Sequence, residues 1–147
     1  MQTTVNQKLA FGVPGSFYDD SPRRVDPYTV EEGAIGLAYT VNASDPTKAD
    51  LGGEGVFAGI AVNTKEYVIS GLTASMAFRS GDIAQCATMG RIVLKLADAV
   101  SIGDACFFNA TTGALKPGTS GATVEGYTEI PNSKFVLVNA LANEQSV

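Results

Sequence analysis

The side chains best suited to chemistry in this sequence are carboxylates, because its 147 residues include no histidine. Histidine is the commonest general base, the commonest metal ligand and the usual partner of a serine or cysteine nucleophile. A glycosidase-like pair of carboxylates needs no histidine. The acidic residues that could form such a pair are Asp19, Asp20, Asp82, Asp98, Asp104 and Glu125.

Two of these carboxylates have a simpler expected role in turns. Asp82 follows glycine in S-G-D, and Asp104 follows glycine in I-G-D. An aspartate at the entry to a strand usually accepts hydrogen bonds from the backbone of its own turn. We therefore predict no catalytic residue and no enzymatic activity for this chain.

Neither a cofactor site nor a metal site is expected. The glycine-rich stretches at 50–55 and 117–126 lack the G-x-x-x-x-G-K-[ST] spacing of a phosphate-binding loop. Asp19, Asp20 and Asp26 show no EF-hand spacing, and two arginines among them oppose cation binding. We expect these charges to form ion pairs, either within their own segment or with a partner chain.

The overall charge argues against nucleic acid as a partner. Ten basic and fifteen acidic residues give a formal net charge of −5, the wrong sign for binding a phosphate backbone. No uncharged apolar run approaches the ~20 residues that span a bilayer, and the start of the sequence lacks the pattern of a signal peptide. We predict no membrane partner and synthesis in the cytoplasm.

The two cysteines lie in apolar stretches, Cys86 in IAQCATM and Cys106 in DACFF. A free cysteine in such a setting behaves as a small hydrophobic residue. Two cysteines in a chain of this length do not form a disulfide framework. Buried free thiols are therefore favoured, and a Cys86–Cys106 disulfide is the alternative.

The pattern of apolar residues predicts an all-β fold. No helical period is sustained over ten positions, and the best short helical stretch lies within 66–78. A hairpin is expected near Gly113, and 42–55 is expected to be a polar, solvated loop. The body, residues 31–147, is predicted to be a single β-sandwich or jelly-roll-like barrel. The expected strands are 34–41, 55–62, 82–89, 91–97, 104–109 and a last one from residue 134.

Residues 1–30 form a separate segment, which we predict to be an extended N-terminal arm. Pro14, Pro22 and Pro27 each remove a backbone donor and disfavour helix in the residue before them. Disordered tails are poor in aromatic residues, whereas this segment contains Phe11, Phe17, Tyr18 and Tyr28. The arm is therefore expected to run over a protein surface.

The order of motifs along the chain resembles one known family. From Ser80 the sequence reads SGDIAQCATMGRIVLKLADAVSIGDACFFNATTGAL, and from Gly126 it reads GYTEIPNSKFVLVNALANEQSV. An extended leader with PG-x-F and SPR precedes a glycine-rich strand. This order is similar to that of the structural cement proteins of tailed bacteriophages, also called head decoration proteins.

The resemblance implies a non-enzymatic virion protein that binds the outer surface of an icosahedral head. There it would clamp neighbouring subunits of the major capsid protein against the pressure of the packaged DNA. A homodimer or homotrimer is expected, because closed symmetry is the rule for such assemblies. Aromatic anchors and register-fixing arginines are expected in the arm. The predicted contacts with the capsid or a neighbouring subunit are Phe11, Phe17, Tyr18, Asp19, Asp20, Arg23, Arg24 and Tyr28.

Two other functions fit parts of the sequence. A carbohydrate-binding or adhesin-like β module is the main alternative, although such sites usually stack sugars on aromatic faces. The chain has no tryptophan and only 8% aromatic residues, which disfavours that function. An enzyme that works with carboxylates alone would need two acidic residues in one cleft, with at least one raised pKa.

Overall fold

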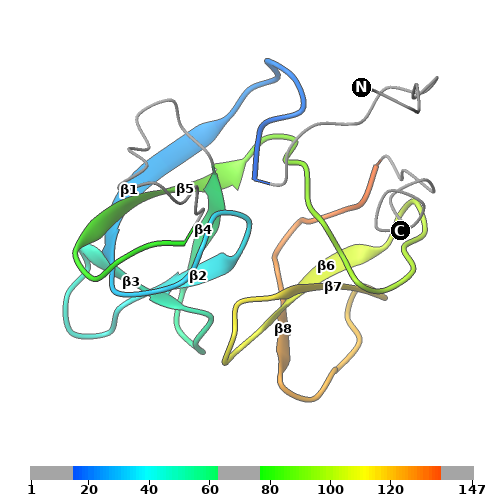
Figure 1. The fold of residues 1–147 in the computed structure, drawn as a ribbon. Helices are drawn as coiled ribbons and strands as arrows, with labels where there is room; N and C mark the ends of the chain where they lie inside the picture. Colours follow the sequence, from blue (N-terminus) through cyan, green and yellow to red (C-terminus); the bar gives the residue numbers. More distant parts are fainter. Residues whose placement is uncertain (1–14, 63–76, 137–147) are drawn as a thin grey trace, which may run out of the picture.

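The computed structural model describes residues 15–62 and 77–136, which contain eight β-strands and no helix (Figure 1). The prediction of an all-β fold is confirmed. The short helix considered within 66–78 lies outside the described residues, apart from its last two positions. The strands are β1 (Arg24–Val30), β2 (Ala38–Val41), β3 (Lys48–Leu51), β4 (Phe57–Val62), β5 (Asp82–Met89), β6 (Ala105–Asn109), β7 (Leu115–Gly118) and β8 (Tyr127–Glu129).

Five strands close into a barrel in the order β1-β3-β2-β4-β5, and β5 pairs with β1 to complete the ring. The β1–β3 pair is parallel, and the other four pairs are antiparallel. Closure gives each strand two neighbours, which removes most of the open backbone edge of a sheet. The prediction was a single β-sandwich or jelly-roll-like barrel, and the described residues form a small mixed ring with a separate three-stranded sheet beside it (Figure 1).

The interior of the barrel is built from small residues around two aromatic rings. Barrel diameter grows with strand number, so five strands leave little room inside. The rings of Tyr39 and Phe78 meet edge to face with their centroids 6.4 Å apart. The Tyr39 hydroxyl donates a hydrogen bond of 2.9 Å to the carbonyl of Glu32. The buried small residues around the rings are Ala49, Ala58, Ala61, Ala84 and Cys86.

The second sheet has the order β7-β6-β8 and is antiparallel throughout. A tight turn joins β6 to β7, and the side-chain oxygen of Asn109 accepts hydrogen bonds from the backbones of Thr111 and Thr112 at 2.7 and 3.0 Å. Gly113 has a φ of 69°, a left-handed conformation that favours glycine. The hairpin predicted around Gly113 is confirmed.

The barrel and the second sheet share one apolar core. Cys106, Phe108 and Ile130 from the sheet side pack against Ala38 and Ile60 of the barrel. The hairpin also contacts the barrel through its backbone. The amide of Ala38 donates to the Gly113 carbonyl at 2.9 Å, and the amide of Gly53 donates to the Ala110 carbonyl at 2.7 Å.

The strand list from the sequence differs from the structure at several places, and it omits β8 (Tyr127–Glu129). β3 lies inside 42–55, which was expected to be a loop, because Ala49 and Leu51 are the only apolar residues of this short strand. The predicted strand 91–97 is not a strand, and within it only Ile92 forms an isolated bridge, to Phe17. The alternate side chains Ile92 and Leu94 of this segment pack against the shared core, while its backbone crosses between the two sheets. The strand expected from residue 134 lies mostly outside the described residues, and 134–136 are not in a strand.

The structure also places the end of the predicted arm, residues 24–30, in the barrel as β1. β1 covers residues 24–30 and pairs with β5 over its whole length. Pro27 fits in this strand because β3 pairs only with Thr29 and Val30, so no described strand lies along the other edge of Pro27. A missing N–H is tolerated at such an edge. The extended arm remains a prediction for the residues that precede β1.

Candidate functional site

Two of the acidic residues considered for catalysis, Asp82 and Asp104, accept backbone hydrogen bonds within turns. The Asp82 carboxylate accepts a hydrogen bond from the amide of Arg79 at 2.8 Å. The Asp104 carboxylate accepts one from the amide of Ser101 at 3.0 Å. The predicted turn role of both residues is confirmed. Within 15–62 and 77–136, no three histidine, cysteine, aspartate or glutamate side chains lie together as ligands for an ion.

Cys86 and Cys106 are buried free thiols, as favoured by the sequence. Burial raises the pKa of each thiol to about 12, and for Cys86 the nearby Asp26 carboxylate adds to the effect. Thiols with such a pKa stay protonated at neutral pH and are poor nucleophiles. Both cysteines therefore act as small core residues, one in the barrel and one in the shared core.

The described part of the predicted arm before β1 lies against the body. We call residues 15–23 the arm base. Its backbone pairs with the chain that leaves β5: the amide of Tyr18 donates to the Arg91 carbonyl at 2.9 Å, and the amide of Val93 donates to the Ser16 carbonyl at 2.9 Å. The amide of Gly15 donates to the Val93 carbonyl at 2.7 Å. These three bonds fix the position of the first described residues, 15–18, on the body.

Gly15 is required at the start of this pairing because no other residue fits there. Its φ is +84°, a conformation that side chains with a Cβ rarely adopt. A Cβ at this position would collide with the Ile35 side chain and lie 3.2 Å from the amide nitrogen of Gly36. Gly36 is itself bonded to the barrel through the Ala61 carbonyl at 2.8 Å.

Arg23 and Phe17 form the next part of the arm base. The guanidinium carbon of Arg23 lies 4.7 Å from the centroid of the Phe17 ring, which is a cation–π contact. Gly90 lies beneath this pair with a φ of +126°, and a Cβ there would be 3.0 Å from the Phe17 ring and 3.2 Å from the Arg23 Cβ. The end of β5 thus supports an aromatic ring covered by a cation.

Asp19 links the arm base to the body by charge. Its carboxylate accepts hydrogen bonds from the hydroxyl and the amide of Ser21, and it lies 3.5 Å from the Arg91 guanidinium. The hydroxyl of Ser21, its amide and then Arg91 hold the pKa of Asp19 below the usual 3.8. A second pair joins Arg24 to Asp26 at 3.4 Å. Ion pairing within the predicted segment is confirmed for Arg24, and Asp19 pairs with the body.

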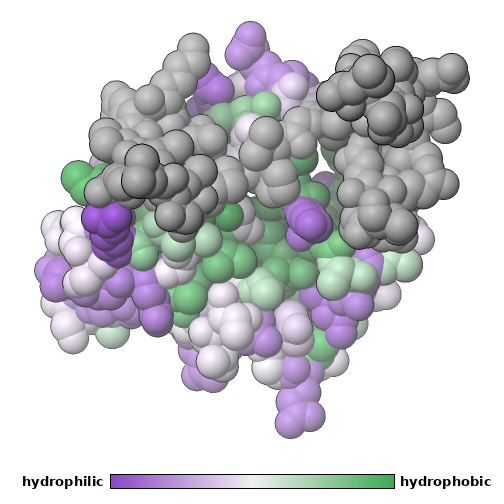
Figure 2. Space-filling model, in the orientation of Figure 1, coloured by the Kyte–Doolittle hydropathy of each residue, from purple (hydrophilic) through white to green (hydrophobic). Residues whose placement is uncertain are grey.

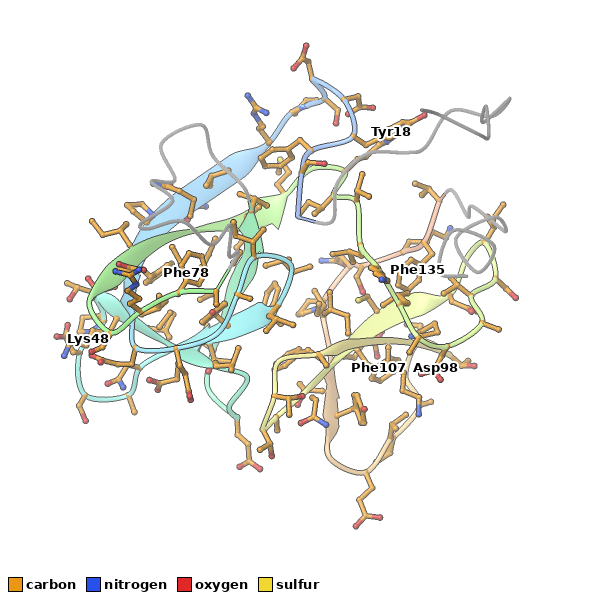
Figure 3. The ribbon with its side chains drawn as sticks, viewed as in Figure 1. Tyr18, Lys48, Phe78, Asp98, Phe107 and Phe135 are labelled. Carbon is orange, nitrogen blue, oxygen red and sulfur yellow. The ribbon has the colours of Figure 1, made fainter. Side chains whose placement is uncertain are left out.

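The structure places five of the predicted contact residues in one segment, because Phe17, Tyr18, Asp19, Asp20 and Arg23 all lie in the arm base. Tyr18, with 43% of its surface exposed, lies at the rim of the molecule (Figure 3). Arg24 directly follows the arm base, and Tyr28 instead packs partly against the barrel core. Phe11 lies outside the described residues.

The sequence analysis did not identify the residues of the body that contact the arm base. Arg91 pairs with Asp19, and Gly90 supports Phe17. The available signal was the alternation of 91–97, which puts Arg91 on the face opposite Ile92 and Leu94. Figure 2 shows apolar side chains gathered between the barrel and the second sheet, where the shared core lies.

No helix among the residues described is long and apolar enough to cross a membrane. The family model described as structural cement protein (E217 gp24/Pam3 gp6) matches residues 1–145. The chain belongs to this family of phage structural cement proteins. Membership gives the chain a capsid-associated, structural role in a bacteriophage virion, as the order of its sequence motifs implied.

The fold of this cement protein is also found in a solved phage particle. A chain from the structure titled "The capsid of Myoviridae Phage XM1" superposes with a TM-score of 0.61 at 19% sequence identity. The match covers 92% of this chain and 89% of that chain. The search of curated proteins found no match.

Proposed function

We propose that this cement protein binds the outer surface of a tailed-phage icosahedral head and clamps neighbouring subunits of the major capsid protein. In this role it stabilises the shell against the pressure of packaged DNA and has no catalytic activity. The observation that carries the proposal is the arm base. Its residues 15–18 are fixed to the body by three backbone hydrogen bonds, while Tyr18 remains 43% exposed at the surface.

The anchored arm base favours clamping because it lowers the entropy lost on docking. Residues 15–18 are held by the body before any partner arrives, and prolines restrict the chain on both sides of them. Fourteen residues precede Gly15, and an extended chain of that length reaches at most about 50 Å. That reach is sufficient for the arm to dock on a neighbouring capsid subunit or on a sister cement subunit in a homodimer or homotrimer.

The chemistry of the arm base matches that of protein interfaces. Aromatic residues and arginine dominate interface energetics, and here Phe17, Tyr18 and Arg23 lie together. Phe11 is the proposed apolar anchor further along the arm, Arg23 and Arg24 are proposed to fix register, and Asp20 is proposed to take part in charge pairs there. Tyr28 is a proposed contact only through the part of its side chain that the barrel core leaves exposed.

The experiment is cosedimentation of the purified protein with undecorated, expanded heads. Deletion of residues 1–14 is the appropriate truncation, because removal of 1–30 would also remove β1 and open the barrel. We expect the full-length protein to saturate the heads at a fixed ratio per capsid subunit and the truncated protein to bind much more weakly. Equal binding by both proteins would refute the role of the arm, and binding by neither would refute the capsid-binding function.

A further inference from the structure

The arm base connects two pairings with the same neighbouring chain. Arg24 pairs with Met89 at the end of the β1–β5 pairing, and Phe17 forms an isolated bridge with Ile92. Between these two pairs the N-terminal side has six residues, 18–23, and the other side has only two. The longer side therefore forms a loop that is closed at both ends. In Figure 1 this loop is the blue bend that leads into β1.

The loop is held by contacts that are partly exposed to solvent. The amide of Ser21 donates to the Asp19 carboxylate at 3.1 Å, and that carboxylate lies 3.5 Å from the Arg91 guanidinium. The side chains of this ion pair are 54% exposed at Arg91 and 36% at Asp19, and ion pairs of such exposure contribute little to stability. Arg23, which covers the Phe17 ring, is exposed as well. The loop can therefore open at a small cost in free energy.

β1 is attached to the barrel far more firmly. All seven of its residues pair with β5, and Thr29 and Val30 also pair with β3. Val30 is completely buried, and Tyr28 packs partly against the barrel core. Detaching β1 opens the ring and exposes this apolar surface to water. Segments with few buried apolar contacts open at the lowest free energy, so the arm base opens more easily than the barrel.

The order of the chain places the weaker attachment first. A pull on the N-terminal arm enters the described structure at Gly15, and the hydrogen bonds of 15–18 carry it to residues 91–93. β1 begins at Arg24, after the whole arm base, so it carries load only when those bonds have broken. Position and strength therefore give the same order of events, in which the arm base detaches while the barrel stays closed.

We infer that the arm base is an extensible link between the arm and the barrel. Under tension, residues 15–18 separate from 91–93, the loop straightens, and the chain from 15 to 23 is released. A released segment of this length spans at most about 30 Å. The link lets the body shift relative to a docked arm without losing its fold. The inference rests on the proposed function, because a docked arm is what puts the link under tension.

Force spectroscopy on single molecules tests the link. Handles are attached to cysteines introduced into the full chain by Pro14→Cys and Ala43→Cys. Residue 43 is exposed between β2 and β3, and the native thiols are buried. We expect two steps on pulling, a first of at most about 30 Å that reverses on relaxation, and a second at higher force as the barrel opens. A record without a separate first step overturns the inference.

A matched pair of glycine variants assigns the first step to the arm base. Gly90 and Gly81 have φ values of +126° and +90°, so alanine strains the backbone at either position. At Gly90 the added Cβ lies 3.0 Å from the Phe17 ring and 3.2 Å from the Arg23 Cβ, whereas at Gly81 it meets nothing within 4 Å. We expect Gly90→Ala to detach the arm base about tenfold faster at a given force, the effect of crowding a packed contact. Gly81→Ala should leave the first step unchanged, and equal effects in the two variants contradict the inference.

Arg23→Ala provides the same test if Gly90→Ala does not fold. Arg23 is exposed, and its truncation removes the cation above the Phe17 ring. We expect faster detachment in the first step and an unchanged second step. A first step that does not respond to this substitution contradicts the inference.

Cosedimentation with heads distinguishes failure of the link from failure of the proposed function. A protein that decorates heads but shows no separate first step on pulling keeps the cement function and lacks the link. Failure to bind heads overturns both the proposed function and the role of the link in clamping.

Discussion

β5 lies between β1 and β4 and pairs with both of them, whereas residues 91–97, which follow it after Gly90, pair with a described residue only over their first half. Both segments were predicted to be strands, although only 91–97 places its apolar Ile92, Leu94 and Leu96 at alternate positions. β5 buries Ala84 and Cys86 inside a closed ring, and 91–97 buries Leu94 against the core shared with the second sheet.

The difference shows that alternation and strand formation are separate properties. Alternation decides which side chains face the core. A hydrogen-bonded strand also needs a neighbouring chain on at least one edge, and that neighbour is supplied by the topology. In the barrel the chain supplies all the neighbours itself. At 91–97 the described residues supply only the arm base as a neighbour.

The largest expected effect is a loss of stability from a substitution in the core of the barrel. Tyr39 is completely buried, so Tyr39→Ala should lower the free energy of unfolding by about 3–5 kcal/mol, the cost of removing a large buried ring. Chemical denaturation measures this. The matched control is Tyr18→Ala at the exposed arm base, which should change stability by less than about 1 kcal/mol and weaken head binding. A more destabilising effect from Tyr18→Ala would contradict the division into core and contact surface.

A smaller loss of stability is expected from substitutions in residues 91–97. Leu94 is half-buried against the shared core, so Leu94→Ala should cost about 1–2 kcal/mol, less than a fully buried leucine. Lys95→Ala, the neighbouring exposed position, should stay within about 0.5 kcal/mol of the wild type in the same denaturation experiment. Equal losses of stability at both positions would show that the segment is not held in place by the apolar face that carries Leu94.

The smallest effect concerns the charge that joins the arm base to the body. The folded-state pKa of Asp19 is lowered, chiefly by Ser21, so its contribution is present at neutral pH and is lost as the pH falls through that lowered pKa. The carboxyl carbon shift of Asp19, followed by NMR against pH, should show a midpoint below 3.8. Ser21→Ala should move the midpoint back toward the usual value. An unchanged midpoint in that variant would contradict the assigned cause.

Much of the fold could be predicted because local rules and tertiary contacts agree there. The predicted limits 82–89 match β5, and the hairpin follows from Asn109 and Gly113. The predictions failed where tertiary contacts decide. β3 is a strand because β1 and β2 flank it, and β1 includes Pro27 because its barrel neighbours leave one edge open there. No local pattern contains that information.

Half of the candidate site could also be predicted. Proline and aromatic content marked Phe17, Tyr18 and Arg23, since these are local features of the segment before β1. The partners of these residues, Gly90 and Arg91, lie about seventy positions later in the sequence. Their role depends on the end of β5 lying beside the arm base, which follows from the pairing of β1 with β5.

The most direct test of the central claim is a cryo-EM reconstruction of heads decorated with this protein. The account predicts that the arm base contacts the shell or a neighbouring cement subunit, with Tyr18 and Arg23 buried in that contact. A reconstruction in which the protein sits on the shell through other surfaces, with both side chains exposed to solvent, would contradict it.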